Sequence, residues 1–196
     1  AFLWKIPGTT CLNLKQTHQV IKLYRDVLSI VAPHVILLTE TNLPHEENIS
    51  YFGDGDEAHM VYQFSLPPLL ADALLQEDID ILQQWLITLG TTQSGTTFLN
   101  FTASHDGIGI RPLEGLVPWE RVSALVTATE KSGGRISVRR TLNETDVPYE
   151  LNVTYRDLLG TDQDLIVDRF ILSQAVMLSL AGIPGIYFHS LVGSGN

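Results

Sequence analysis

The sequence predicts an α/β protein whose strands form a parallel sheet or barrel. Four short apolar runs, at residues 34–40, 59–64, 96–102 and 183–189, alternate with longer segments of helical periodicity. With 196 residues and 44% hydrophobic content, the chain can bury one sizeable core. A complete (β/α)8 TIM barrel needs about 250 residues. The chain therefore fits the C-terminal half of such a barrel, as one domain over residues 1–196.

The first predicted helix covers residues 15–32. Its apolar side chains, among them Val20, Tyr24 and Val27, recur at helical spacing, and Pro33 stops the helix. The run at residues 34–40 is almost continuously apolar, which is typical of a strand buried on both faces. This strand ends in a carboxylate, Glu40.

The middle of the chain continues the alternation. Residues 59–64 predict a strand, and residues 66–90 predict a helix with a break at 76–78. The strand predicted at 96–102 is followed by His105, Asp106 and a loop with two glycines, Gly107 and Gly109. Glycines at such a place are expected to let a substrate approach the main chain closely.

The last third departs once from this pattern. Pro118 suits the first turn of a helix that Gly133 and Gly134 end. Two β-like pieces around the polar turn at residues 143–146 predict an insertion or hairpin, which extends over residues 132–155. A helix at 164–181 and a strand at 183–189 complete the predicted order.

Composition excludes several classes of function. A net charge of −10, from 12 Lys+Arg against 22 Asp+Glu, argues against nucleic acid and anionic membranes as partners. The single cysteine favours a reducing compartment, so we expect a cytoplasmic protein. The six histidines lack metal-binding spacing, and Gly107-x-Gly109 alone is too weak a signal for a dinucleotide site. We therefore expect no metal and no cofactor, and a small molecule as the partner.

Two carboxylates carry the chemical prediction. Glu40 and Asp106 follow different strands, and the C-terminal ends of barrel strands converge on one mouth. Paired acids at such a place are what glycosidic bond cleavage uses. The alternative for Glu40 is a cap of the following helix, and the alternative for His105-Asp106 is a satisfied polar pair at a loop start.

Four runs give the sequence a more specific resemblance: HVILLTETN, VYQFSLPPLL, FTASHDGIG and AGIPGIYFHSLVG. Together they resemble the α-amylase superfamily, and within it the sucrose-phosphorylase-like subfamily. Two longer runs, SYFGDGDEAHMVYQF and FTASHDGIGIRPLEG, look most similar to glucosylglycerate and sucrose 6-phosphate phosphorylases. The resemblance implies a hexosyl-transferring glycoside phosphorylase, with a sugar and inorganic phosphate as substrates and glucose 1-phosphate as product.

The resemblance assigns roles to the two acids and their neighbour. Glu40 matches the general acid/base of the family, and Asp106 matches the carboxylate that stabilises the transition state. His105 matches a donor to the glucosyl ring. The nucleophilic Asp of the family precedes residue 1, so we expect the chain to be a fragment that is inactive by itself.

The resemblance also assigns residues around the acceptor. Tyr149 matches an aromatic on a mobile loop that lines the phosphate or acceptor site, and Glu150 follows it. Phe2 stands where relatives often carry Tyr. Thr41 and Asn42 stand where some sucrose phosphorylases carry Val-His, which implies a changed acceptor pocket.

Phosphate requires positive charge near the mouth. Arg111 is the first candidate, because a guanidinium matches phosphate oxygens in a bidentate way. Arg135, Arg139 and Arg140 are weaker candidates, since each is also typical of a solvated surface.

Three other functions stay open at this point. The same carboxylates would serve an α-glucoside hydrolase or transglucosidase of the same superfamily. A truncated barrel without activity is a second alternative. A metal-dependent HD phosphohydrolase is the third and most distant, because those enzymes place His-Asp on helices, whereas His105-Asp106 follows a predicted strand.

Overall fold

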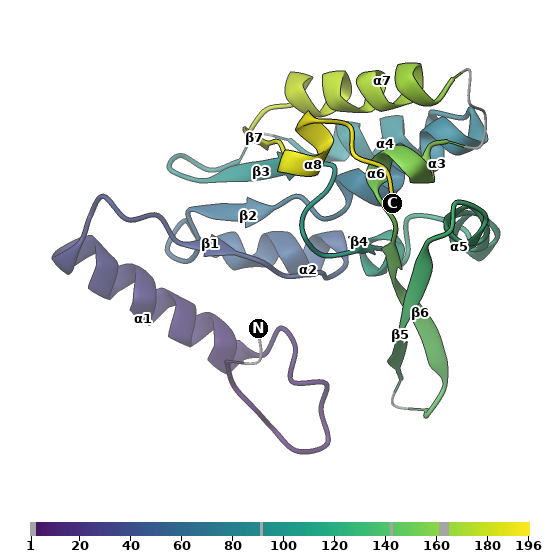
Figure 1. Cartoon of the computed structure of the whole chain (residues 1–196). Helices are drawn as coiled ribbons and strands as arrows, with labels where there is room; N and C mark the ends of the chain where they lie inside the picture. Colours follow the sequence, from purple (N-terminus) through teal and green to yellow (C-terminus); the bar gives the residue numbers. More distant parts are fainter. Residues whose placement is uncertain (1–2, 91, 142, 161–164) are drawn as a thin grey trace.

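The computed structural model describes residues 3–90, 92–141, 143–160 and 165–196. Its main sheet is parallel and has the order β1-β2-β3-β7, formed by Leu38–Thr39, Met60–Tyr62, Thr97–Phe101 and Ile183–Gly185. Each of the first three strands pairs in parallel with the next strand in this order. The predicted α/β class with a parallel sheet is confirmed (Figure 1).

Helices connect these strands. The longer ones are α1 (Lys15–Val31), α3 (Leu66–Gln76), α4 (Asp80–Thr88), α5 (Trp119–Lys131) and α7 (Ile166–Ser179). The shorter ones are α2 (His45–Ile49), α6 (Tyr155–Leu158), α8 (Phe188–Leu191) and two 3-10 turns, η1 (Ser50–Phe52) and η2 (Arg111–Leu113). The predicted break between α3 and α4 is present, and Glu77 adopts a left-handed conformation there with φ 53°.

A second, antiparallel sheet stands beside the first. Strands β5 (Arg135–Arg140) and β6 (Asp146–Asn152) form the predicted hairpin, and β4 (Ile108–Gly109) pairs with the other side of β6. The Gly-rich segment after His105-Asp106 is therefore partly a strand, where a loop was predicted. Figure 1 shows the hairpin projecting away from the main sheet.

The larger hydrophobic core lies among α3, α5, α7 and the second sheet. Leu125, Leu151 and Leu158 are fully buried in it. Tyr155 is buried in the same core and donates its hydroxyl hydrogen to the carbonyl oxygen of Pro67, 2.9 Å away. Burial raises the pKa of this tyrosine. This core holds α3 behind the C-terminal end of β2.

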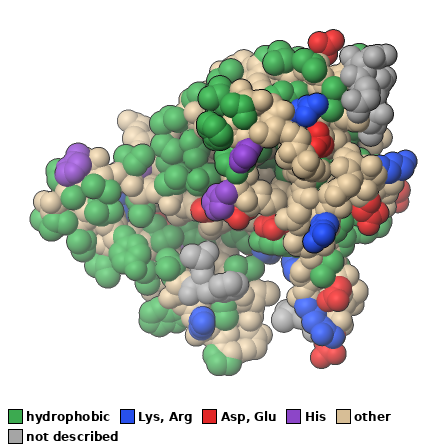
Figure 2. Space-filling view, viewed as in Figure 1, with side chains coloured by type: hydrophobic (Ala, Val, Ile, Leu, Met, Phe, Trp, Pro, Cys, Tyr) green, Lys and Arg blue, Asp and Glu red, His purple; other side chains and the backbone are tan. Residues whose placement is uncertain are grey.

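A smaller core joins α1 to the sheet. It contains Ile21 of α1 together with Tyr51, Phe52, Val61 and Phe98. Polar contacts reinforce it: His18 Nδ1 lies 2.7 Å from Glu57 Oε2, and the ring of His18 stacks on that of Tyr51. Other apolar side chains of α1, such as Tyr24 and Ile30, are exposed, and Figure 2 shows hydrophobic side chains gathered over this helix.

All four predicted strands of the main sheet are shorter than expected, most of all the two edge strands, and one burial prediction is wrong. Val35, Ile36 and Leu38 are exposed, although this run was expected to be buried on both faces. Val35 and Ile36 precede β1, and within the described residues β1 is an edge strand with β2 as its neighbour on one side and no strand on the other. At the other edge, β7 ends at Gly185, and the predicted strand residues Phe188 and His189 belong to α8.

One glycine is required for the chain to enter β7. Gly182 has φ +135°, and a Cβ there would lie 2.7 Å from Asn100 Nδ2 and 2.8 Å from the carbonyl oxygen of Phe98. Asn100 itself donates to the carbonyl oxygen of Ala181.

Within the described part of the chain, no helix has the length and apolar character to cross a membrane.

Candidate active site

A cavity of about 810 Å³ opens at the C-terminal ends of β1 and β3. The loop before α1 bounds it on one side and the β5–β6 hairpin on the other, and the surface is hollowed between them in Figure 2. Its chemically active lining residues are Glu40, Asn42, Tyr51, Phe64, Asp106, Arg111, Arg139, Arg140, Tyr149 and Glu150. Six predicted site residues, Glu40, Asn42, Asp106, Arg111, Tyr149 and Glu150, thus share one cavity.

The two predicted acids enter the cavity from different strands. Glu40 directly follows β1, and Asp106 follows β3 in the loop before β4. Both side chains are solvent-exposed. Tyr62 is the last residue of the intervening strand β2. Burial raises the pKa of its hydroxyl, and the charges of Glu40 and Asp106 raise it further.

An aromatic cluster lies at the C-terminal ends of β2 and β3. The ring of Tyr62 stacks on that of Phe64 with centroids 5.5 Å apart, and both rings meet the edge or face of Phe101, at 5.3 and 5.4 Å. Phe64 itself lines the cavity. Such flat apolar surface beside carboxylates suits a sugar ring, which offers C–H groups on its faces and hydroxyls at its edge.

Basic residues contribute to the wall of the cavity on the side of the hairpin. Arg111, Arg139 and Arg140 line the cavity, whereas Arg135 of the same strand is not among its lining residues. Glu114 ties two of them together, since its carboxylate lies 2.7 Å from Arg139 Nη2 and 3.9 Å from Arg111 Nε. Three of the chain's 12 basic residues thus face one cavity of an acidic protein. This wall suits an anion.

A β-bulge turns two consecutive side chains into the cavity. Ser137 pairs with Glu150 and Val138 pairs with Pro148, so Tyr149 has no partner on β5. Successive side chains of a regular strand point to opposite faces, and an extra residue changes this alternation. Tyr149 and Glu150 accordingly both line the cavity. Burial raises the pKa of Glu150, and the nearby charge of Asp106 raises it further.

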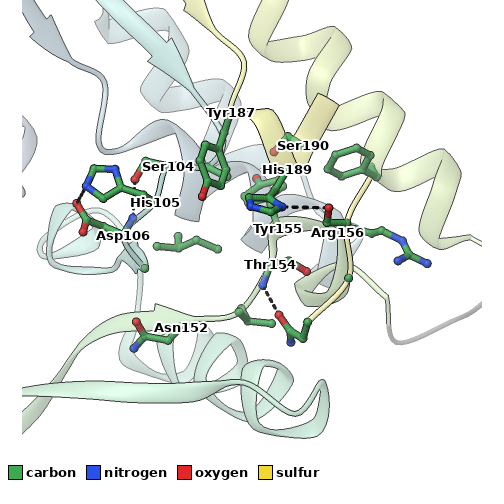
Figure 3. A pocket seen from close by; sticks show the side chains of 18 residues that line it. Ser104, His105, Asp106, Asn152, Thr154, Tyr155, Arg156, Tyr187, His189 and Ser190 are labelled. Carbon is green, nitrogen blue, oxygen red and sulfur yellow. Dashed lines mark hydrogen bonds and ion pairs between the residues drawn. The ribbon is translucent and has the colours of Figure 1, made fainter. Parts of the chain in front are cut away.

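His105 faces a different cavity. It lines a pocket of about 340 Å³ with Asp106, Tyr187 and His189, as Figure 3 shows, and its Nε2 lies 3.6 Å from Asp106 Oδ2. Asp106 lines both cavities and so stands between them. The structure therefore keeps His105 beside Asp106 and outside the cavity that contains Glu40. The predicted contact Phe2 lies outside the described residues.

The two glycines after Asp106 make room for protein atoms, where a substrate was predicted. A Cβ at Gly109 would lie within 2.6 Å of three atoms of the Asn42 side chain. A Cβ at Gly107 would lie 2.8 Å from Asn152 Oδ1 and 3.1 Å from the Cβ of Glu150. These glycines let β4 pass close to β6 and to the residues after Glu40.

The metal-dependent HD phosphohydrolase alternative requires a group of metal ligands and a His-Asp pair on a helix. Among the described residues, no group of three or more His, Cys, Asp or Glu side chains is arranged to hold a metal ion. His105-Asp106 lies in the loop after β3, whereas the HD phosphohydrolase alternative needs this pair on a helix. The position of the pair, at a strand end, argues against that alternative.

Sequence reasoning missed two features of this site. The aromatic cluster of Tyr62, Phe64 and Phe101 was not singled out, although all three residues lie in or just after predicted strands. The strand-end position, which pointed to Glu40, was the available signal for Phe64 as well. The pairing of the hairpin decides which arginine faces the cavity, and periodicity alone contains no signal for it.

Comparisons with known proteins give a consistent result. The chain is 49% identical over its whole length to a glucosylglycerate phosphorylase from Spirochaeta thermophila and 47% identical to one from Escherichia coli. It spans 34% and 36% of the length of these curated relatives. No family model matches it.

A solved structure gives the same picture of the fold. The whole chain superimposes on 38% of a sucrose 6F-phosphate phosphorylase from Thermoanaerobacter thermosaccharolyticum, with a TM-score of 0.81 and 20% identity. At this identity the likeness concerns the fold alone. The predicted partial barrel and the predicted resemblance to the sucrose-phosphorylase-like subfamily are both confirmed.

Proposed function

Because this chain is similar over its whole length to sucrose-phosphorylase-like enzymes of the α-amylase superfamily, we propose that the protein containing it is a retaining glycoside phosphorylase. It would transfer a glucosyl group from an α-glucoside to phosphate and release glucose 1-phosphate. The identity of nearly half of the residues with two phosphorylases is the observation that carries this proposal. The chain would supply the last four barrel strands, β1, β2, β3 and β7, with the hairpin as an insertion.

In the first step of the proposed reaction, a nucleophilic carboxylate outside this chain attacks the anomeric carbon. The bond from that carbon to the leaving oxygen breaks, and Glu40 donates its proton to this oxygen. Asp106 stabilises the positive charge that develops on the sugar ring. The shared cavity of Glu40 and Asp106 supports these roles, because both carboxylates can meet one bound sugar there.

In the second step, phosphate takes the place of the departed acceptor. A phosphate oxygen attacks the anomeric carbon and displaces the nucleophilic carboxylate, so the configuration is retained through two inversions. Glu40, now ionised, accepts a proton from the incoming phosphate. Arg111, Arg139 and Arg140 hold the phosphate oxygens, while Tyr149 and Glu150 line the same side of the cavity.

The basic wall also suggests the class of acceptor. The acceptor leaves from the place that phosphate then occupies, so the arginines that hold phosphate also face the acceptor. An acceptor with a carboxylate or a phosphate group fits three guanidinium groups better than a neutral sugar does. As the substrate we propose glucosylglycerate before other charged glucosides, because the names of the relatives contain it. We also propose a cytoplasmic location, where inorganic phosphate is available.

A phosphorolysis screen tests the function. The full-length protein is incubated with glucosylglycerate, sucrose 6-phosphate, sucrose and glucosylglycerol, with and without inorganic phosphate, and glucose 1-phosphate and free glucose are measured. We expect glucose 1-phosphate only with phosphate, and fastest release from a charged glucoside. Equal release of free glucose with and without phosphate would identify a hydrolase instead.

A further inference from the structure

A buried hydrogen-bonded bridge begins at the residue that follows Glu40. The hydroxyl of Thr41 donates to Asn48 Oδ1, 2.6 Å away, and Asn48 Nδ2 donates to the carbonyl oxygen of Tyr62, 2.8 Å away. Asn48 belongs to α2 and is completely buried, and Thr41 is also buried. One side chain thus joins the residue after Glu40 to the last residue of β2.

The bridge begins at Thr41, which is buried and also contributes to the wall of the cavity beside Glu40. Thr39 and Thr41 are buried, whereas Glu40 between them is exposed, which is the alternation of an extended chain. Among the described residues, Glu40 has no hydrogen bond or ion pair with another side chain. Its carboxyl group is therefore placed by its own backbone, and the bridge fixes that backbone.

The short edge strand makes this bridge important. β1 contains only two residues and pairs with β2 alone, so the regular ladder ends before Glu40. Beyond Thr39, the bond from Thr41 through Asn48 to Tyr62 continues the connection between the two strands. Loss of the Thr41 hydroxyl would leave a buried amide oxygen without its donor and loosen the strand end.

We propose that Thr41 and Asn48 are positioning residues for Glu40, which hold its carboxyl group at the oxygen of the leaving acceptor. This inference rests on the proposed function, in which Glu40 is the general acid. It predicts a selective defect, because a misplaced acid slows only those reactions whose leaving group needs a proton. α-Glucosyl fluoride provides the comparison, since fluoride departs as a stable anion and needs no proton from Glu40.

The key variant is Thr41→Val, which removes the hydroxyl at nearly constant volume. Thr39→Val is the matched control: it makes the same change at another buried threonine, two residues earlier, whose hydroxyl has no hydrogen-bond partner among the described residues. Thr41→Ser keeps a hydroxyl and serves as the rescue variant.

Each variant of the full-length protein is assayed with the α-glucoside found by the screen and with α-glucosyl fluoride, both with saturating phosphate. We expect Thr41→Val to lower kcat on the glucoside by about 10- to 100-fold with little change in KM, and to leave fluoride release within about twofold. Thr39→Val should leave both rates unchanged, and Thr41→Ser should restore the glucoside rate. Asn48→Asp, which keeps the acceptor for Thr41 and loses the donor to Tyr62, should show the same selective defect more weakly.

The ratio of the two rates is the deciding quantity, because both are measured on one preparation and the folded fraction cancels. An equal loss on both donors, or a Thr41→Val ratio equal to that of Thr39→Val, would overturn the positioning role. If the unsubstituted protein consumes neither donor, the proposed function fails instead. The two failures are therefore distinguishable.

Discussion

Charged residues are arranged in opposite ways in the helical layer and at the strand ends. In the helical layer, Arg121 of α5 lies 2.7 Å from the buried carboxylate of Asp72 and also pairs with Asp78. At the strand ends, Glu40 and Arg140 have no ion-pair partner within 4.0 Å among the residues that the structure describes. The first group is satisfied within the protein, and the second is available to a ligand.

This difference separates the residues that stabilise the fold from those that we expect to act on substrate. A buried charge without a partner destabilises a fold, so Arg121 and Asp72 depend on each other. An exposed carboxylate in a cavity contributes little to stability. Substitutions in the two regions should therefore change different measurable quantities.

The largest effect is expected for Glu40→Gln. Glutamine has nearly the same shape as glutamate, but its amide cannot act as a general acid. Turnover of the α-glucoside should therefore fall by about 10²- to 10⁴-fold. The free energy of unfolding should stay unchanged, because the side chain is exposed. Steady-state kinetics and urea denaturation of the same preparation check both statements. A normal rate on the glucoside would remove Glu40 from the acid role.

The next effect concerns stability. Arg121→Ala leaves the buried carboxylate of Asp72 without its cation and should lower the free energy of unfolding by about 3 kcal/mol. Arg169→Ala is the control, because its partner Glu77 is 75% exposed, and it should cost about 0–1 kcal/mol. Urea denaturation measures both. Equal losses in the two variants would contradict the contrast between the regions.

A smaller effect is expected in the basic wall. Arg140→Ala should raise the KM for phosphate about 10-fold, since a charged hydrogen bond is lost. Arg135→Ala, on the same strand but outside the cavity, should leave this KM unchanged. Phosphate titrations at saturating glucoside provide the measurement. The same increase in both variants would show a general charge effect and no specific site.

The smallest effect is a pH dependence of stability. Burial lowers the pKa of His45, which meets the ring of Trp85 edge-on. Its buried Nδ1 has no hydrogen-bond partner in the part of the chain that the structure describes. Because the folded-state pKa is below the unfolded value of about 6.5, the unfolded chain binds the proton more readily. Stability is therefore complete above pH 6.5 and falls as the pH decreases below it. His45→Phe should weaken this dependence in urea denaturation between pH 5 and 7.5, whereas the same change at exposed His34 should not.

The sequence predicted the elements whose signal is local. The periodicity of residues 15–32 placed α1, and the polar residues near 77 placed the break between α3 and α4. The exposure of Val35 and Ile36 was not predictable in this way, because it depends on which strands lie beside β1. Apolar composition predicts that a strand can be buried, and topology decides whether it is.

The same distinction between local signals and topology applies to the candidate site. Glu40 and Asp106 were found because strand ends are recognisable in sequence and barrel geometry brings them together. The hairpin determines two features that the sequence did not predict: His105 is separated from Glu40, and Arg140 lines the cavity. Both depend on the pairing of β6 with β4 and with β5. Asn48 carried no sequence signal, since its role arises only from two contacts across neighbouring strands.

The β-bulge at Tyr149 has a consequence for how the lining of this cavity can change. The hairpin projects from the main sheet, and the insertion or deletion of a single residue there would exchange inward and outward positions along the rest of the strand. Such a change replaces a whole set of ligand contacts at once and leaves Glu40 and Asp106 where they are. A shift of register in the hairpin would thus change the lining of the cavity without rebuilding the parallel sheet that holds Glu40 and Asp106.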